Sequence, residues 1–179
     1  QEIYDMIVSL SANLRYTIKG GELVSLQEEL DYVDRYILLQ KTRLGGRLEV
    51  TKKINPKGNL AVIPKISIQM LVGNAIIHGM PEDGAVLHII IRVCMENNRL
   101  LISVYDDGKG ILPEKVKELN DIFSGKSADT GNSIGLPNLA SRLKILYQGE
   151  AGLFLESQGD QFTEVKMELP IRKRGNENV

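Results

Sequence analysis

Residues 98–110 read Asn-Arg-Leu-Leu-Ile-Ser-Val-Tyr-Asp-Asp-Gly-Lys-Gly, and this stretch decides the fold. Leu100, Ile102 and Val104 alternate with other residues, which predicts a strand with one apolar face. Asp106 has the same parity and therefore ends the strand on that apolar face. A carboxylate in this position destabilises the fold unless a hydrogen-bond donor reaches it. The sequence thus predicts a buried strand that ends at a polar site.

Asp106, Gly108 and Gly110 form an Asp-x-Gly-x-Gly pattern directly after this strand. Glycine lets the backbone turn sharply and approach a flat ligand closely. The exocyclic amine of adenine is a donor that suits the carboxylate. The same pattern also occurs as an ordinary turn after a strand, so by itself it leaves both interpretations open.

The flanking sequence supplies the rest of a sheet. Residues 87–94 alternate in the same way, and Asn97-Asn98 predicts a tight hairpin turn between the two strands. Two further strands are expected near 153–157 and 162–169, and a weaker one over 47–54.

Helical periodicity surrounds these strands. Apolar residues at intervals of three and four, with helix-starting prolines, predict helices over 1–18, 26–44, 64–79 and 136–146 and a short one opened by Pro113. Ser25 and Glu28 form a capping-box pattern at the start of the second helix. Pro64 is expected in the first turn of the third.

These helices beside a mostly antiparallel sheet favour an α+β fold. We expect a two-layer α/β sandwich preceded by an N-terminal helical segment. The chain has no regular βαβα alternation and no GxxxxGK[ST] phosphate loop. We expect a helical segment over 1–44, a main domain over 45–172 and a polar tail over 173–179.

Asn74 and His78 lie four residues apart, so they share one face of the third helix. The helix is otherwise apolar, and buried polar groups need partners. A core asparagine and a histidine at the helix end would satisfy this pattern. A neutral oxygen ligand for a metal and a nearby phosphate contact would satisfy it equally.

A loop rich in glycine and polar residues, 124–135, leads into the helix that starts at Leu136. Its last part contains Ser133 and Gly135. Free backbone N–H groups and the positive end of the helix dipole suit phosphates at such a position. Loops of this kind also cap helices without any ligand.

The three elements together resemble the GHKL ATPase superfamily, and within it the YesM/LytS-like sensor histidine kinases. Residues 68–79 resemble the N box, 106–110 the first glycine box and 133–138 the second. The segments 10–16, 40–43, 138–143 and 163–170 are also similar to this family, so the resemblance covers nearly the whole chain.

The resemblance implies an ATP site between the sheet and the helices. Asn74 would hold Mg²⁺, with Asn74 and His78 as catalytic residues, and Asp106 would accept from the adenine amine. The remaining nucleotide-binding positions implied by the motifs are Gly108, Gly110, Ser133, Gly135, Leu136 and Thr163.

Three residues depart from the family pattern. Gly73 stands where the family usually has glutamate, Ser133 replaces a leading glycine, and Phe162 replaces the glycine before Thr163. We expect Gly73→Glu to raise the rate of autophosphorylation, unless Gly73 makes room for a neighbouring side chain. A catalytically weakened nucleotide-binding or partner-binding module is therefore the alternative to an active kinase.

A water-activating ATPase clamp of the gyrase or Hsp90 kind is disfavoured. Such enzymes place a carboxylate four residues before the metal-binding asparagine, and this chain has Met70 there.

Composition limits the partners. The 22 Lys and Arg residues balance 23 Asp and Glu residues, with a net charge of −1 and no block of one sign, so nucleic acid is not expected as a partner. The single cysteine allows no internal disulfide. The resemblance implies a response regulator as partner, a homodimer formed through upstream helices, and an acceptor histidine upstream. It also implies the cytoplasmic domain of a bacterial plasma-membrane protein, whose membrane segments lie outside this chain.

Overall fold

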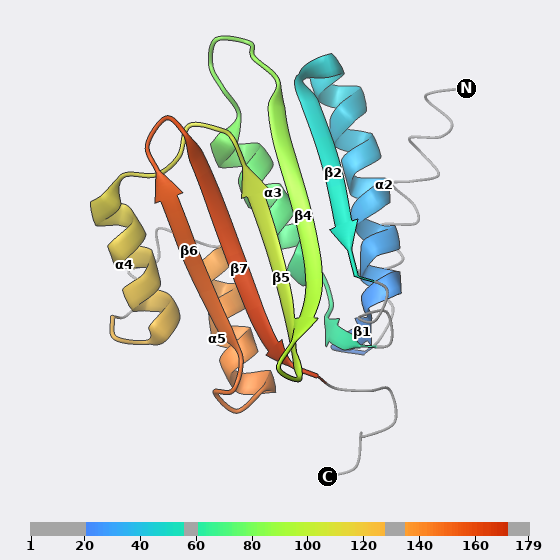
Figure 1. Cartoon of the computed structure of the whole chain (residues 1–179), viewed down its shortest axis with the longest axis vertical. Helices are drawn as coiled ribbons and strands as arrows, with labels where there is room; N and C mark the ends of the chain where they lie inside the picture. Colours follow the sequence, from blue (N-terminus) through green and yellow to red (C-terminus); the bar gives the residue numbers. More distant parts are fainter. Residues whose placement is uncertain (1–20, 56–60, 128–134, 172–179) are drawn as a thin grey trace.

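A mixed five-stranded sheet forms one layer, and helices cover one of its faces (Figure 1). This computed structural model describes residues 21–55, 61–127 and 135–171. Along the chain the elements are β1 (Leu23–Ser25), α2 (Leu26–Leu44), η1 (Gly45–Arg47), β2 (Leu48–Ile54), β3 (Val62–Pro64), α3 (Ser67–Gly79), β4 (Leu87–Glu96), β5 (Arg99–Asp106), α4 (Pro113–Ser124), α5 (Leu136–Leu146), β6 (Gly152–Gln158) and β7 (Phe162–Pro170). The expected α+β fold is confirmed. The first expected helix, 1–18, lies outside the described residues.

The strands are ordered β2-β4-β5-β7-β6, and β7 inserts between β5 and β6. The β2–β4 pair is parallel and the other three pairs are antiparallel. Asn97 and Asn98 both have positive φ, 48° and 60°, as a tight hairpin between β4 and β5 requires. This order places the end of β5 beside the start of β7, where the polar site was predicted.

The sheet buries one face only. Along β5 the apolar residues are at most 2% exposed on the helix side, while the intervening residues are half-buried. Helices α3 and α5 lie behind the sheet in Figure 1, with α2 and α4 at its two sides. Leu26, Leu30 and Val33 of α2 join the same apolar core as α3 and the sheet. Helix α2 is therefore packed as an integral layer of this unit.

The start of α2 follows the sequence prediction. Ser25 is the N-cap, its side chain accepts from the Glu28 N–H, and the Glu28 carboxylate accepts from the Ser25 N–H at 2.9 Å. The capping box is therefore confirmed. The preceding strand β1, which pairs with β3, was not expected because three residues carry too little pattern to predict.

The expected role of Pro64 was wrong. Pro64 ends strand β3, and α3 begins only at Ser67, after Ile66 adopts a left-handed conformation with φ 67°. The fully buried Glu29 carboxylate on α2 accepts from the N–H groups of Ile66 at 2.8 Å and Ile68 at 3.0 Å. A distant carboxylate thus supplies the acceptor that starts this helix, which local sequence cannot reveal.

Helix α4 covers the free edge of β6. The Asn120 side chain donates to the Leu155 carbonyl at 2.8 Å and accepts from the Leu155 N–H at 3.0 Å. One amide thereby pairs with the strand as a neighbouring strand would. No described helix is long and apolar enough to cross a membrane.

Candidate functional site

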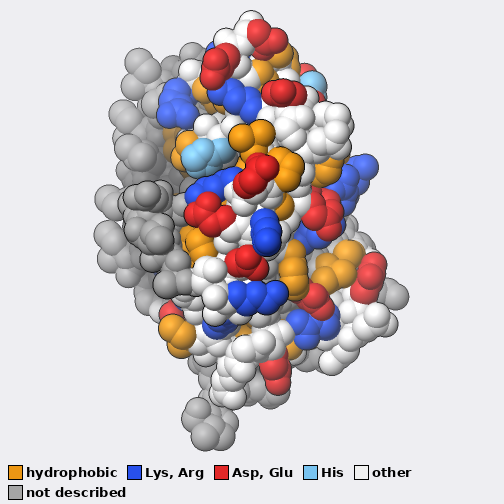
Figure 2. Space-filling view, turned by 90° about the vertical axis from the view of Figure 1, so that its left-hand side faces the viewer, with side chains coloured by type: hydrophobic (Ala, Val, Ile, Leu, Met, Phe, Trp, Pro, Cys, Tyr) orange, Lys and Arg blue, Asp and Glu red, His pale blue; other side chains and the backbone are white. Residues whose placement is uncertain are grey.

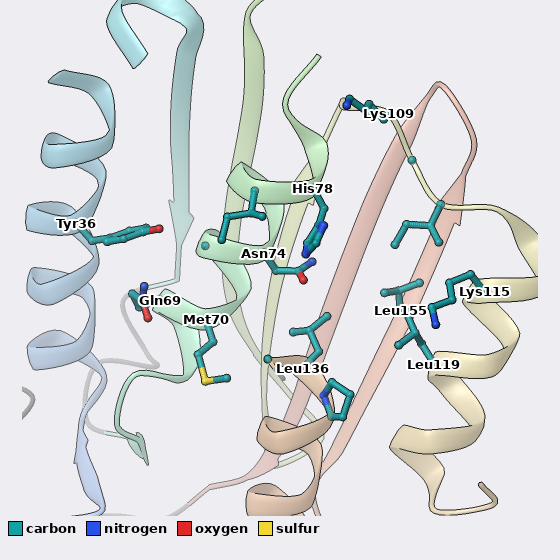
Figure 3. Close-up of a pocket in the computed structure, with 16 residues that line it drawn as sticks. Tyr36, Gln69, Met70, Asn74, His78, Lys109, Lys115, Leu119, Leu136 and Leu155 are labelled. Carbon is teal, nitrogen blue, oxygen red and sulfur yellow. The ribbon is translucent and has the colours of Figure 1, made fainter. Parts of the chain in front are cut away.

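A cavity of about 690 Å³ lies between α2, α3, α4 and the start of α5 (Figure 3). Helix α3 supplies the largest share of its wall: Gln69, Met70, Gly73, Asn74, Ile77 and His78. Tyr36 of α2 closes one side, and Lys115 of α4 stands on the other (Figure 3). A cavity of this size accommodates a nucleotide-sized ligand.

The structure brings Asn74 and His78 together on the cavity wall. Asn74 is half-buried and His78 is exposed. The two side chains therefore face open space and need no core partners. Their amide and imidazole groups are available to a ligand in the cavity.

Asp106 ends β5 with only 2% of its surface exposed. The Gly108 N–H donates to its Oδ1 at 3.1 Å. Burial raises the pKa of this carboxyl from 3.8 to about 6; the Gly108 hydrogen bond opposes the shift, and the nearby Asp107 charge adds to it. The residues that line the cavity include Lys109 and Gly110, which follow Asp106 in the chain, but not Asp106, Gly108 or Thr163.

Thr163 stands opposite Asp106 in the β5–β7 register and is 6% exposed. Its hydroxyl lies 3.1 Å from the hydroxyl of Ser157 on β6. Ser157 also accepts from the Ile111 N–H at 2.7 Å and donates to the Phe162 carbonyl at 2.6 Å. Ser157 therefore fixes the loop after β5 against the β6–β7 turn. Sequence reasoning missed it because its role depends on three contacts that are distant or cross-strand.

Gly79 is a second residue that sequence reasoning missed, since it was expected only to end the helix. A Cβ on Gly79 would lie 2.6 Å from Oδ1 of Asp106, which is closer than real Cβ atoms approach. A Cβ on Gly108 would lie 2.1 Å from the Gly79 carbonyl oxygen. The end of α3 thus rests directly on the Asp106–Gly108 turn, and neither glycine tolerates a side chain.

Gly110 lines the cavity and has φ 64°, a conformation that favours glycine. A Cβ there would lie 2.0 Å from the carbonyl oxygen of Gln158. The Asp160 N–H donates to the Lys109 carbonyl at 2.6 Å in the same contact. The second glycine of the pattern therefore permits close packing against the β6–β7 turn.

Phe162 departs from the family pattern without entering the cavity. Its neighbour Thr163 faces the core, so Phe162 points to the opposite face of the sheet. There its ring stacks on Tyr105, with 5.7 Å between the ring centroids.

Gly135 and Leu136 line the cavity at the start of α5, and Gly135 is the N-cap residue. The N-terminal end of this helix therefore borders the cavity. Ser133 lies outside the described residues. On the face that carries α4, acidic and basic side chains are interspersed over the described part of the surface (Figure 2).

A divalent cation would have few protein ligands here. Among the described residues, no group of three or more His, Cys, Asp or Glu side chains could hold a metal ion. Mg²⁺ commonly binds through one or two protein oxygens, water and substrate phosphates. The Asn74 amide oxygen on the cavity wall fits a site of that kind. It does not fit a site in which protein groups supply every ligand.

Comparisons with known proteins identify the family of this chain. Residues 64–173 match the family model described as histidine kinase-, DNA gyrase B- and HSP90-like ATPase, and residues 1–48 match the histidine kinase model. The sensor protein LytS of Bacillus anthracis is 28% identical over 174 residues, 96% of this chain. The sensor histidine kinase YpdA of Escherichia coli is 36% identical over 146 residues, 79% of this chain. This chain spans 29% and 24% of the length of these two relatives.

Solved structures show the same fold. The catalytic domain of histidine kinase ThkA superposes with a TM-score of 0.59 at 18% identity, covering 83% of this chain and 94% of that one. The histidine kinase domain from Erythrobacter litoralis gives 0.54 at 20% identity, covering 96% and 75%. With the family model matching more than half of the residues, this chain belongs to the family of histidine kinase-, DNA gyrase B- and HSP90-like ATPases.

Proposed function

We propose that this domain binds Mg-ATP and transfers its γ-phosphate to a histidine outside the chain. The observation that carries the proposal is Asp106, a buried carboxylate three residues before the first lining residue of the loop after β5, Lys109. The Gly108 N–H donates to one of its two oxygens, which leaves acceptor capacity for a ligand. The exocyclic amine of adenine supplies the missing donor.

The adenine end of the site lies around Asp106 and Thr163. The close packing of Gly79 on Gly108 and on the Asp106 carboxylate fixes the position of that carboxylate. Gly110 and Ile111 line the cavity beside it and present a narrow, apolar edge to a flat base. These residues bind and orient the base.

The phosphates run along α3 towards the start of α5. Asn74 offers an amide oxygen for Mg²⁺, and the bound cation would neutralise charge that develops on the phosphates. The N–H groups at Gly135 and Leu136 offer donors to phosphate oxygens, and Ser133 belongs to the same motif. His78 lines the cavity on the same helix face as Asn74, between the adenine end and the outer phosphates, where its imidazole could donate to a phosphate oxygen.

The acceptor histidine lies outside this chain. The chain has two histidines, of which His78 belongs to the cavity wall. His88 is held by Asp107, whose carboxylate lies 2.7 Å from Nδ1. A histidine on upstream helices, paired in a homodimer, would receive the phosphoryl group and pass it to an aspartate of a response regulator. Membrane attachment, where present, would come from segments outside this chain, and nucleic acid is not a partner.

Calorimetry with Mg-ATP and Mg-GTP tests the proposal. We expect the chain to bind ATP in preference to GTP, and Asp106→Asn to lose at least tenfold in affinity, about 1.4 kcal/mol. Equal affinity for both nucleotides would contradict the adenine site. ATP binding without phosphoryl transfer by the intact kinase would favour the alternative of a weakened nucleotide-binding module.

A further inference from the structure

Gly73 is a buried glycine in the interior of α3, at a position that faces the cavity. Glycine in a helix interior destabilises it by about 1 kcal/mol relative to alanine. A Cβ on Gly73 would lie 3.3 Å from the hydroxyl oxygen of Tyr36, which is tighter than most real Cβ contacts. A neighbouring side chain therefore fills the space above this glycine. The finding supports the alternative interpretation of Gly73 over the expected gain from Gly73→Glu.

Tyr36 reaches this position from α2. Figure 3 shows its ring directed towards α3, with the hydroxyl at the end nearest the helix. Burial is the main reason that the pKa of its phenol is raised, and the charge of Arg43 opposes the shift, as do hydrogen bonds with the side chains of Gln69 and Gln40. The phenol is therefore a neutral hydrogen-bond donor at physiological pH. A neutral donor avoids the repulsion that a carboxylate would experience next to phosphates.

Helix α2 holds Tyr36 rigidly. Two turns earlier on the same helix, the Glu29 carboxylate binds the N-terminal N–H groups of α3. The apolar side of α2 joins the common core. Because α2 and α3 are tied at one end and packed along their length, the position of the Tyr36 hydroxyl over α3 is well defined.

The position along α3 identifies which part of the ligand Tyr36 meets. Adenine binds near Gly79, where α3 ends against Asp106. With a rise of about 1.5 Å per residue, Asn74 lies roughly 8 Å and Gly73 roughly 9 Å back along the helix axis. A nucleotide anchored at Asp106 and stretched along α3 would carry its outer phosphates into the part of the cavity lined by Asn74, Tyr36 and the start of α5.

We propose that Tyr36 is a further substrate-contacting residue, whose hydroxyl donates to a terminal phosphate oxygen of ATP in the space above Gly73. The inference rests on the proposed function. In the transition state, negative charge is spread over the three equatorial oxygens of the transferred phosphoryl group, and Tyr36 would donate to one of them. A fixed donor at this point therefore accelerates transfer more than it tightens ATP binding.

The test is Tyr36→Phe in the intact kinase, measured as kcat and KM for ATP in autophosphorylation. We expect kcat to fall about tenfold while KM stays within about threefold. Tyr32→Phe is the matched control, because Tyr32 is a buried tyrosine on the same helix that does not line the cavity. An unchanged kcat in Tyr36→Phe would overturn the proposal.

A second variant separates contact from folding. Gly73→Ala adds a methyl group 3.3 Å from the hydroxyl and should lower kcat by displacing it. In the double variant with Tyr36→Phe the two losses should not add, because both act on one hydroxyl. Additive losses would contradict the proposal. Melting temperatures of the single variants verify that the fold is intact, and ATP binding by the parent chain shows separately whether the proposed function holds.

Discussion

Acidification should weaken nucleotide binding by protonating Asp106. The pH at which this happens is the pKa of Asp106, which burial raises. Burial raises the pKa of this carboxyl from 3.8 to about 6 in the free protein. The adenine amine needs the ionised carboxylate as its acceptor. Binding therefore requires Asp106 to lose its proton first, and below about pH 6 the affinity should fall about tenfold per pH unit.

The same group changes folding stability with the opposite sign. Between about pH 4 and 6 the folded chain holds a proton on Asp106 that the unfolded chain has lost. Stability from this group is thus fully present below pH 3.8 and is lost as the pH rises through about 6. A shift of about 2 pH units corresponds to at most about 3 kcal/mol. Lowering the pH should therefore raise the stability of the fold and lower its affinity for the nucleotide.

Two measurements between pH 5 and 8 test the predicted loss of affinity and gain of stability on acidification, with Asp106→Asn as the reference. Calorimetry gives the affinity ratio of parent to variant, in which proton uptake by the nucleotide phosphates cancels. Urea denaturation gives the corresponding difference in unfolding free energy. A ratio of affinities that stays constant through pH 6 would refute the assignment of Asp106 as the base-binding carboxylate.

Three further substitutions have defined consequences. Glu29→Gln removes the charged acceptor from three N–H groups at the start of α3, and urea denaturation should show a loss of about 2 kcal/mol; an unchanged midpoint would contradict this. Gly79→Ala forces a Cβ against Asp106, so calorimetry should show at least a tenfold loss of ATP affinity, and wild-type affinity would show that the contact can relax. Asn120→Ala leaves the edge of β6 unpaired at Leu155 and should cost about 1–2 kcal/mol of stability with ATP affinity unchanged.

Alternation was sufficient to predict the sheet from sequence, and motif spacing pointed to Asn74, His78, Gly110, Gly135 and Leu136, which line the cavity. Strand β5 was predicted because Leu100, Ile102 and Val104 mark one face. Asp106 follows at the same two-residue interval, so the sequence alone places it on that face. These signals are local, so a short window of sequence contains them. The β4–β5 hairpin and the capping box of α2 were predictable for the same reason.

The parts that escaped prediction depend on contacts between distant segments. Helix α3 starts where it does because Glu29, far away in the sequence, supplies the acceptor for its first N–H groups. Ser157 and Gly79 are site residues only because the chain brings them against Ile111 and Asp106. A serine in a strand and a glycine at a helix end carry no sign of such partners in their own neighbourhood.

Departures from a family motif have to be weighed by where each side chain lies. Phe162 replaces a glycine, yet its ring stacks on Tyr105 on the far face of the sheet, so the cavity is unaffected. Gly73 stands where the resemblance leads us to expect a glutamate, yet the Tyr36 hydroxyl lies over it and would, under our proposal, supply a polar group from another helix. A motif records which residue usually provides a group at one position of the chain. The chemistry requires only that the group be present at that point in space, so the loss of a motif residue argues for lost activity only when no other segment reaches the same place.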